Sequence, residues 1–180
     1  SSDLMDFRVD QSRGLHFIYV LPFSDRQLLI ESTMISTQLE DKDWYRQAMV
    51  AWLESQDIEI EQTLREEAGV IPMDTITPVD SQIACRGAAS GAVRLSSGYA
   101  FSGIQAQIAK LAQGISAGDY SVPPPISPGL VRMDRIFNAV LMARPELGVS
   151  IMMRTARALD GNGFARFMLG AATIADWARV

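Results

Sequence analysis

Hydrophobic residues gather in two short runs near the start of the chain. Residues 15–21 (LHFIYVL) and 28–35 (LLIESTMI) are rich in β-branched and aromatic side chains, and a short polar turn lies between them. Two such runs around a polar turn are typical of an antiparallel hairpin. The pattern therefore predicts two paired strands.

The pattern then changes to helical spacing. Asp41 is a suitable N-cap, and apolar residues recur behind it at intervals that place them on one face of a helix over residues 42–55. Residues 57–71 are predicted to form another strand, which ends at Pro72.

Small residues dominate the next part of the chain. A short apolar strand is predicted at residues 83–85, followed by the small-residue stretch 86–92 (RGAASGA) and a helix that begins near residue 99 and ends near Gly114 or Gly118. A strand that enters a helix through such a loop brings backbone N–H groups close to an anionic ligand. After three prolines at 123–125, the remainder reads as a helical tail.

Composition and charge exclude several classes of protein. The 180 residues are 48% hydrophobic and 21% charged, which suits an ordered core. The net charge of −5, without a Lys/Arg cluster, argues against binding nucleic acid. One cysteine, Cys85, and one histidine, His16, exclude an internal disulfide framework and the usual zinc sites. We therefore expect no metal and a reducing, cytoplasmic location.

The sequence shows no pattern of a membrane-spanning helix or of a signal peptide. No apolar run approaches the roughly 20 residues of a membrane-spanning helix. Residues 1–8 do not resemble a signal peptide. Because a strand is predicted so soon after residue 1, we expect that an upstream segment has been removed.

Glu31 is the candidate for chemistry. In a strand it shares a face with Leu29, Thr33 and Ile35, mostly apolar neighbours. A carboxyl desolvated in this way has a raised pKa and can donate a proton near neutral pH. A glutamate that faces water on an edge strand fits the same pattern, so the residues alone leave both interpretations open.

Four motifs in order carry a resemblance to the lycopene cyclase family. They are the Met-Asp-aromatic-Arg element at 5–8, the segment F-I-Y-V-L-P-F-S-D-R-Q-L-L-I-E-S-T within 15–33, the E-A-G-V-I-P-M element within 66–73, and the small-residue segment at 86–101. The resemblance covers nearly the whole chain.

The chain also departs from the family pattern. Ser32 stands where the family has the second acid of a Glu-Glu or Glu-Asp pair, and Arg94-Leu95 replaces His-Pro before the Gly-Tyr element at residues 98–99. The G-x-G-x-x-G dinucleotide fingerprint is absent. The chain is therefore expected to be the C-terminal part of a flavoprotein.

The resemblance implies an α+β fold, the C-terminal portion of a p-hydroxybenzoate-hydroxylase-like flavoprotein. It implies an antiparallel sheet with a covering helix at 1–78, a returning strand-loop-helix of a dinucleotide fold at 79–118, which would close over FAD, and a helical tail at 119–180.

The resemblance also implies the site. Glu31 is implied as the acid that protonates a double bond of an acyclic carotenoid end group, so that a carbocation closes the ring. Reduced FAD, with NAD(P)H as the electron source, serves the parent protein, while this chain alone is expected to bind none. Residues implied near the flavin are Gly87, Gly91, Gly98 and Tyr99. Lesser candidates for the substrate side are Asp6 and Glu67.

Other functions and partners stay open at this point. A flavin-dependent hydroxylase, a halogenase or an isoprenoid reductase would use the same architecture, but would need no acid aimed at the substrate. An inactive truncated fragment would expose a large apolar patch or hide it in a homodimer. Arginines in the helical tail fit a solvated helix face, and they also fit peripheral contact with a membrane from which the carotenoid is drawn.

Overall fold

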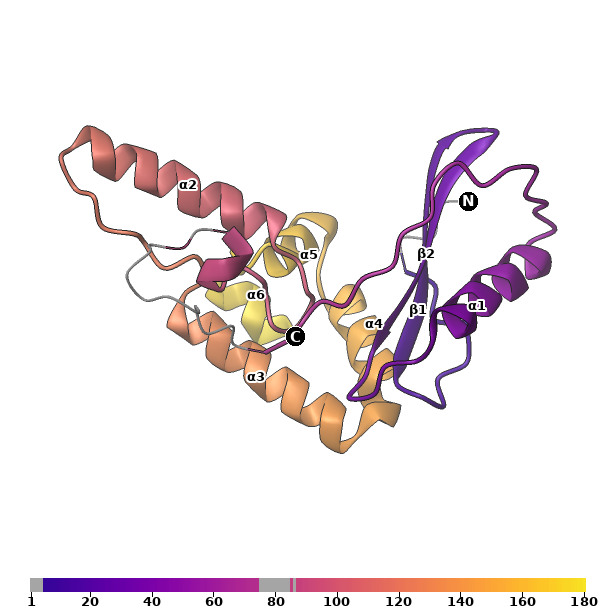
Figure 1. The fold of residues 1–180 in the computed structure, drawn as a ribbon. Helices are drawn as coiled ribbons and strands as arrows, with labels where there is room; N and C mark the ends of the chain where they lie inside the picture. The colour runs from indigo at the N-terminus through magenta and orange to yellow at the C-terminus, as the bar shows by residue number, and fades with distance from the viewer. Residues whose placement is uncertain (1–4, 75–84, 86) are drawn as a thin grey trace. The chain divides into compact units, whose positions relative to one another are not determined.

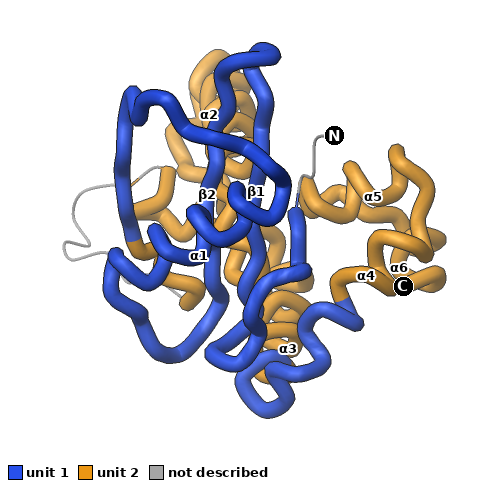
Figure 2. Tube along the Cα trace, turned by 90° about the vertical axis from the view of Figure 1, so that its right-hand side faces the viewer, with its two compact units in different colours: residues 1–69, 141–151 blue, residues 70–140, 152–180 orange. Residues whose placement is uncertain are grey.

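The structure is a computed structural model that describes residues 5–74, 85 and 87–180. It combines helices with a small sheet, and the chain forms two compact units (Figures 1 and 2). The first unit comprises Ser1–Gly69 and Leu141–Ile151, and the second comprises Val70–Val140 and Met152–Val180. The three-part division expected from the sequence concerns roles in a flavoprotein, and it stays a prediction.

The first unit is built on an antiparallel hairpin of β1 (Leu15–Ser24) and β2 (Gln27–Ile35). Its register pairs Tyr19 with Glu31 and Leu21 with Leu29. Asp6 extends this pairing on β1, because its N–H donates to the carbonyl of Ile18 at 2.8 Å. The predicted hairpin is confirmed.

Helix α1 (Lys42–Ser55) covers one face of the hairpin (Figure 1). It begins where the sequence predicts, because the Asp41 carboxylate accepts a hydrogen bond from the Trp44 N–H at 2.8 Å. Trp52 and Leu53 pack against Ile18 and Val20 to form the core. Burying a side chain of this size contributes roughly 1.5–3 kcal/mol, so this contact holds the helix on the hairpin.

The strand predicted for residues 57–71 is wrong. This segment is irregular, and nearly all of its side chains are exposed. Its apolar residues alternate with charges, which resembles a strand pattern, but no strand of the described residues pairs with it. Ion pairs hold it instead, from Arg26 to Glu61 at 2.9 Å and from Arg46 to Glu66.

Helix α2 (Phe101–Ser116) follows the small-residue loop in the second unit, within the limits that the sequence predicts. Its buried side differs from the apolar stripe of the sequence, because Gln107 is buried whereas Phe101, Ile108 and Ile115 are exposed. The loop before it contains a single 3-10 turn, Gly87–Ser90. The strand predicted at residues 83–85 lies outside the described residues, apart from Cys85.

The predicted helical tail is confirmed. It comprises α3 (Pro128–Ala143), a 3-10 turn at Pro145–Leu147, α4 (Gly148–Ala158), α5 (Gly161–Met168) and α6 (Ile174–Arg179). A capping box at Thr173 and Asp176 begins α6, and Arg166 of α5 donates to the same Asp176 carboxylate at 2.9 Å.

None of the described helices is by itself long and apolar enough to span a membrane. The consecutive pair Pro128–Ala143 and Pro145–Ala158 reaches the required length and hydropathy together, but it is bent by 112°.

Candidate active site

Glu31 lies in the middle of β2, on the face of the hairpin that α1 does not cover. Alternation along the strands places its side chain beside that of Tyr19, directly across the ladder. The Thr33 hydroxyl, two residues along the same strand, donates to Glu31 Oε1 at 2.6 Å. The carboxyl is exposed, so the desolvation expected from its apolar neighbours is absent among the described residues.

Glu31 marks a boundary on this face of the hairpin. On one side of it, Leu15 and Phe17 are buried, with 2% and 4% of their surface exposed. Phe7 packs on Phe17, with ring centroids 5.4 Å apart. On the other side, Leu21 and Leu29 are 49% and 47% exposed. The acid therefore adjoins an open aliphatic surface.

Asp6 lies on the opposite face, so the structure does not bring it together with Glu31. Its Oδ2 accepts a hydrogen bond from Trp52 Nε1 at 2.9 Å, inside the contact between α1 and the hairpin. Arg8 donates to both carboxylate oxygens. These bonds, from Arg8 above all, hold the pKa of Asp6 well below its usual range.

Ser32 also faces α1 rather than the Glu31 side. Its hydroxyl lies 2.9 Å from Nε2 of the buried His16, whose Nδ1 lies 3.1 Å from the carbonyl oxygen of Asp10. The Trp44 ring packs against the imidazole in a tilted arrangement, with centroids 4.8 Å apart, and burial lowers the pKa of His16. The serine in place of a second acid thus leaves the Glu31 face unchanged.

Glu67, the other substrate-side candidate, is exposed in the irregular segment of the first unit. Its carboxylate accepts a hydrogen bond from Arg65 at 2.7 Å. No hydrogen bond or ion pair among the described residues joins it to Glu31, so the structure does not bring the two acids together.

The four candidates for flavin contact all belong to the second unit, around the loop that precedes α2. Gly91 has a positive φ of 83°, and a Cβ there would meet no atom within 4 Å. Gly98 has a φ of 71° and lies against Ile71. Tyr99 is exposed and directly precedes Ala100, an N-cap without a side-chain acceptor for the first-turn N–H groups of α2.

A buried glutamine holds the first part of this loop. The N–H of Gly87 and the hydroxyl of Ser90 donate to Gln107 Oε1 at 3.4 and 3.1 Å. Gln107 Nε2 donates in turn to the carbonyl of Pro123 at 3.0 Å. One side chain of α2 thus fixes both the 3-10 turn and the proline segment.

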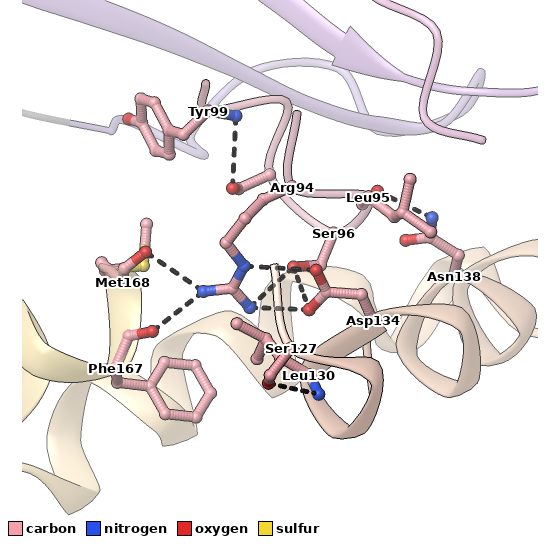
Figure 3. A network of polar contacts seen from close by, with 11 residues as sticks. Arg94, Leu95, Ser96, Tyr99, Ser127, Leu130, Asp134, Asn138, Phe167 and Met168 are labelled. Carbon is pink, nitrogen blue, oxygen red and sulfur yellow. Dashed lines mark hydrogen bonds and ion pairs between the residues drawn. The ribbon is translucent and has the colours of Figure 1, made fainter. Parts of the chain in front are cut away.

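A buried arginine holds the second part of the loop (Figure 3). Arg94 donates to both oxygens of Asp134 in α3, at 3.2 and 2.6 Å. Its remaining N–H groups reach Ser96 and the carbonyls of Phe167 and Met168 in α5. The arginine that replaces the family's histidine therefore ties the loop to two helices of the tail.

Sequence reasoning missed two of these arrangements. The Arg94–Asp134 pair spans 40 positions, and no motif signals it. The bond from Thr33 to Glu31 could have been found, because residues two apart on a strand share a face. Among the described residues, no group of three His, Cys, Asp or Glu side chains could hold a metal ion.

Comparison with known proteins identifies relatives of one kind. The chain is 33% identical over 102 residues to a lycopene beta-cyclase of Pantoea ananas, covering 53% of this chain and 27% of the relative. It is 37% identical over 71 residues to a lycopene beta-cyclase of Pseudescherichia vulneris, covering 39% of this chain and 18% of that relative. No solved structure matches significantly.

The chain thus spans about a quarter or less of the length of these curated relatives. The family model described as lycopene cyclase protein matches residues 1–180, and this chain therefore belongs to the lycopene cyclase family.

Proposed function

We propose that this chain is part of a lycopene beta-cyclase-like flavoprotein, which converts acyclic carotenoid end groups into rings, and that Glu31 is its acid. The observation that carries the proposal is the place of Glu31 on β2, facing away from the core beside the aliphatic surface of Leu21 and Leu29. The names of the two relatives support the reaction class.

The proposed reaction is an isomerisation in which every proton is accounted for. Glu31 donates its proton to a terminal carbon–carbon double bond of the polyene, which leaves a carbocation on the neighbouring carbon. A second double bond attacks this carbon, so that a carbon–carbon bond closes the ring. The positive charge then lies on a carbon of the second double bond, and a proton lost from a carbon next to it passes to the Glu31 carboxylate, which restores a double bond and regenerates the acid. Water must be excluded, since hydration would divert the cation.

An acid on a substrate-facing strand also separates the candidate functions. Hydroxylation, halogenation and hydride transfer do not require a proton donor aimed at the substrate, whereas ring closure does. Asp6 cannot take this role, because it is buried beneath α1 on the opposite face, where Arg8 and the Trp52 indole donate to its carboxylate. The arrangement of carboxylates in the first unit therefore favours the cyclase.

The loop before α2 fits part of a flavin site. The open space beside Gly91 and the α2 N–H groups that lack a side-chain acceptor suit an approaching cofactor, to which Gly87, Gly98 and Tyr99 are adjacent in the chain. An electron-rich reduced flavin, supplied with electrons by NAD(P)H, would stabilise positive charge. The sequence contains no dinucleotide fingerprint, so these residues would close over FAD rather than bind all of it.

The proposal extends to the surroundings of the protein. The substrate is a carotenoid, and exposed arginines of the tail, such as Arg132 and Arg154, would meet anionic lipid headgroups at the cytoplasmic surface of the membrane. The exposed residues Phe101, Ile108 and Ile115 of α2 would be covered by other parts of the flavoprotein or by a second copy of the chain.

Exchange of Glu31 for glutamine tests the proposed function. The complete protein that contains this chain would be expressed in a bacterial host that accumulates lycopene, and the pigments would be separated and quantified. We expect Glu31→Gln to abolish ring formation, because the amide cannot donate a proton of suitable acidity. Glu59→Gln, at an exposed position of the irregular segment, should keep the activity. Unchanged ring formation in Glu31→Gln would remove this residue from the mechanism.

A further inference from the structure

We propose that Thr33 is the positioning residue of the acid: its hydroxyl holds Glu31 Oε1, so that Oε2 carries and delivers the proton. This inference rests on the proposed function. The Thr33 hydroxyl donates to Glu31 Oε1 at 2.6 Å, within the range of charge-assisted O–H···O⁻ bonds. The two side chains lie two residues apart on β2 and therefore on one face.

The bond assigns different tasks to the two carboxyl oxygens. A hydroxyl that donates to Oε1 uses this oxygen as an acceptor, which is the role of the carbonyl oxygen in a neutral carboxyl group, so the proton of the neutral acid is assigned to Oε2. After Oε2 has released this proton to the substrate, Thr33 continues to donate to the carboxylate. The same contact therefore orients the acid before the transfer and stabilises the carboxylate after it.

Ser32, the neighbouring hydroxyl, cannot take over this task. It lies on the opposite face of β2, where its oxygen is 2.9 Å from Nε2 of the buried His16. The Glu31 side chain is exposed, so packing does not limit its rotation as it would in a core. A bond to the strand itself is thus a direct way to hold this long side chain in one orientation.

Two substitutions at Thr33 distinguish the effect of its hydroxyl from the effect of its shape. Thr33→Val has nearly the same shape and suits a strand, but it removes the donor. Thr33→Ser keeps the donor and loses the methyl group. In the complete protein we expect Thr33→Val to lower kcat by about 10- to 100-fold with little change in KM, because the acid is no longer aligned. Thr33→Ser should stay close to wild type.

A second measurement does not depend on catalysis. In the 180-residue chain with labelled glutamate methylenes, NMR coupling constants report whether the Glu31 side chain occupies one rotamer or averages over several. We expect one rotamer in wild type and in Thr33→Ser, and averaging in Thr33→Val. Glu31→Gln tests the proposed function separately, so retained cyclisation there would refute that function while the rotamer result still stands.

Three results would overturn the assignment. They are unaltered coupling constants in Thr33→Val, an unaltered kcat in Thr33→Val, and a loss in Thr33→Ser as large as the loss in Thr33→Val. The last result would show that the methyl group matters rather than the hydroxyl.

Discussion

Two carboxylates of the first unit, Asp6 and Glu31, accept hydrogen bonds from different kinds of donor. Asp6 accepts hydrogen bonds from Arg8 and from the indole of Trp52, and it is buried beneath α1. Glu31 accepts from the hydroxyl of Thr33 and is exposed. A charged guanidinium and a buried indole keep Asp6 ionised, whereas Glu31 is exposed on the face that we propose for the substrate.

The Asp6 carboxylate should make stability depend on pH. Because the pKa of Asp6 is lower in the folded chain than its unfolded value of about 3.9, the stabilisation is present above that value and is lost as the pH falls below it. Asp6→Asn should lower the free energy of unfolding by roughly 1–3 kcal/mol at pH 7. The difference should shrink towards pH 3. Urea unfolding at several pH values measures it, with Asp25→Asn in the exposed turn as control.

A constant difference between wild type and Asp6→Asn at every pH would contradict this account. It would show that the amide disturbs packing around Trp52 rather than removing a charge.

At the scale of elements, the second unit is held by polar side chains that connect distant segments. Gln107 joins the 3-10 turn to the proline segment, and Arg94 joins the loop to α3 and α5. Both are buried, and every polar atom of each side chain has a hydrogen-bond partner, so each acts as a fixed connection. Arg94 suits this role because its planar guanidinium reaches an acid and two carbonyls together.

Removal of the Arg94 guanidinium should destabilise the second unit. Arg94→Met leaves the buried Asp134 carboxylate without its partner, which costs about 3–5 kcal/mol for pairs of this kind. Far-UV circular dichroism during urea unfolding measures the loss. Arg132→Met, on the exposed side of α3, should have little effect. The double variant Arg94→Met/Asp134→Leu should recover much of the loss, because no buried charge remains.

Equal stability of Arg94→Met and Arg132→Met would show that the Arg94–Asp134 pair does not hold the loop.

At the scale of the whole molecule, the proposed acid and the proposed flavin contacts fall in different compact units. Glu31 belongs to the first unit, and the glycine loop with Tyr99 belongs to the second. The chain matches about a quarter or less of the length of its curated relatives. A flavin site built only from residues 1–180 would lack the fingerprint loop that binds the pyrophosphate.

The isolated chain should therefore not retain flavin. We expect the purified 180-residue protein to show no absorbance at the flavin bands in the visible range. Added FAD should leave the tryptophan fluorescence of the protein unquenched. The complete protein, purified in the same way, is the positive control. Stoichiometric FAD on the isolated chain would mean that residues 1–180 form a complete site.

The sequence by itself determined the helices and strands that depend on residues close together in the chain. The hairpin follows from two apolar runs around a turn, the start of α1 from Asp41, and the helical tail from its spacing. Each depends on neighbours a few residues apart, which a single sequence displays. The motifs also determined the family, since the family model matches the whole chain.

Only the tertiary structure decided the strand pairing, the burial and the ion pairs that involve residues far apart in the sequence. The alternation at 57–71 resembles a strand, but a strand needs a neighbour, and no described strand pairs with it. The register decided that Ser32 and Asp6 face α1 while Glu31 faces outward. The ion pair between Arg94 and Asp134 forms only where the loop and α3 lie side by side in the fold. Burial and pairing of charges depend on the whole fold, because they are set by segments that the sequence separates.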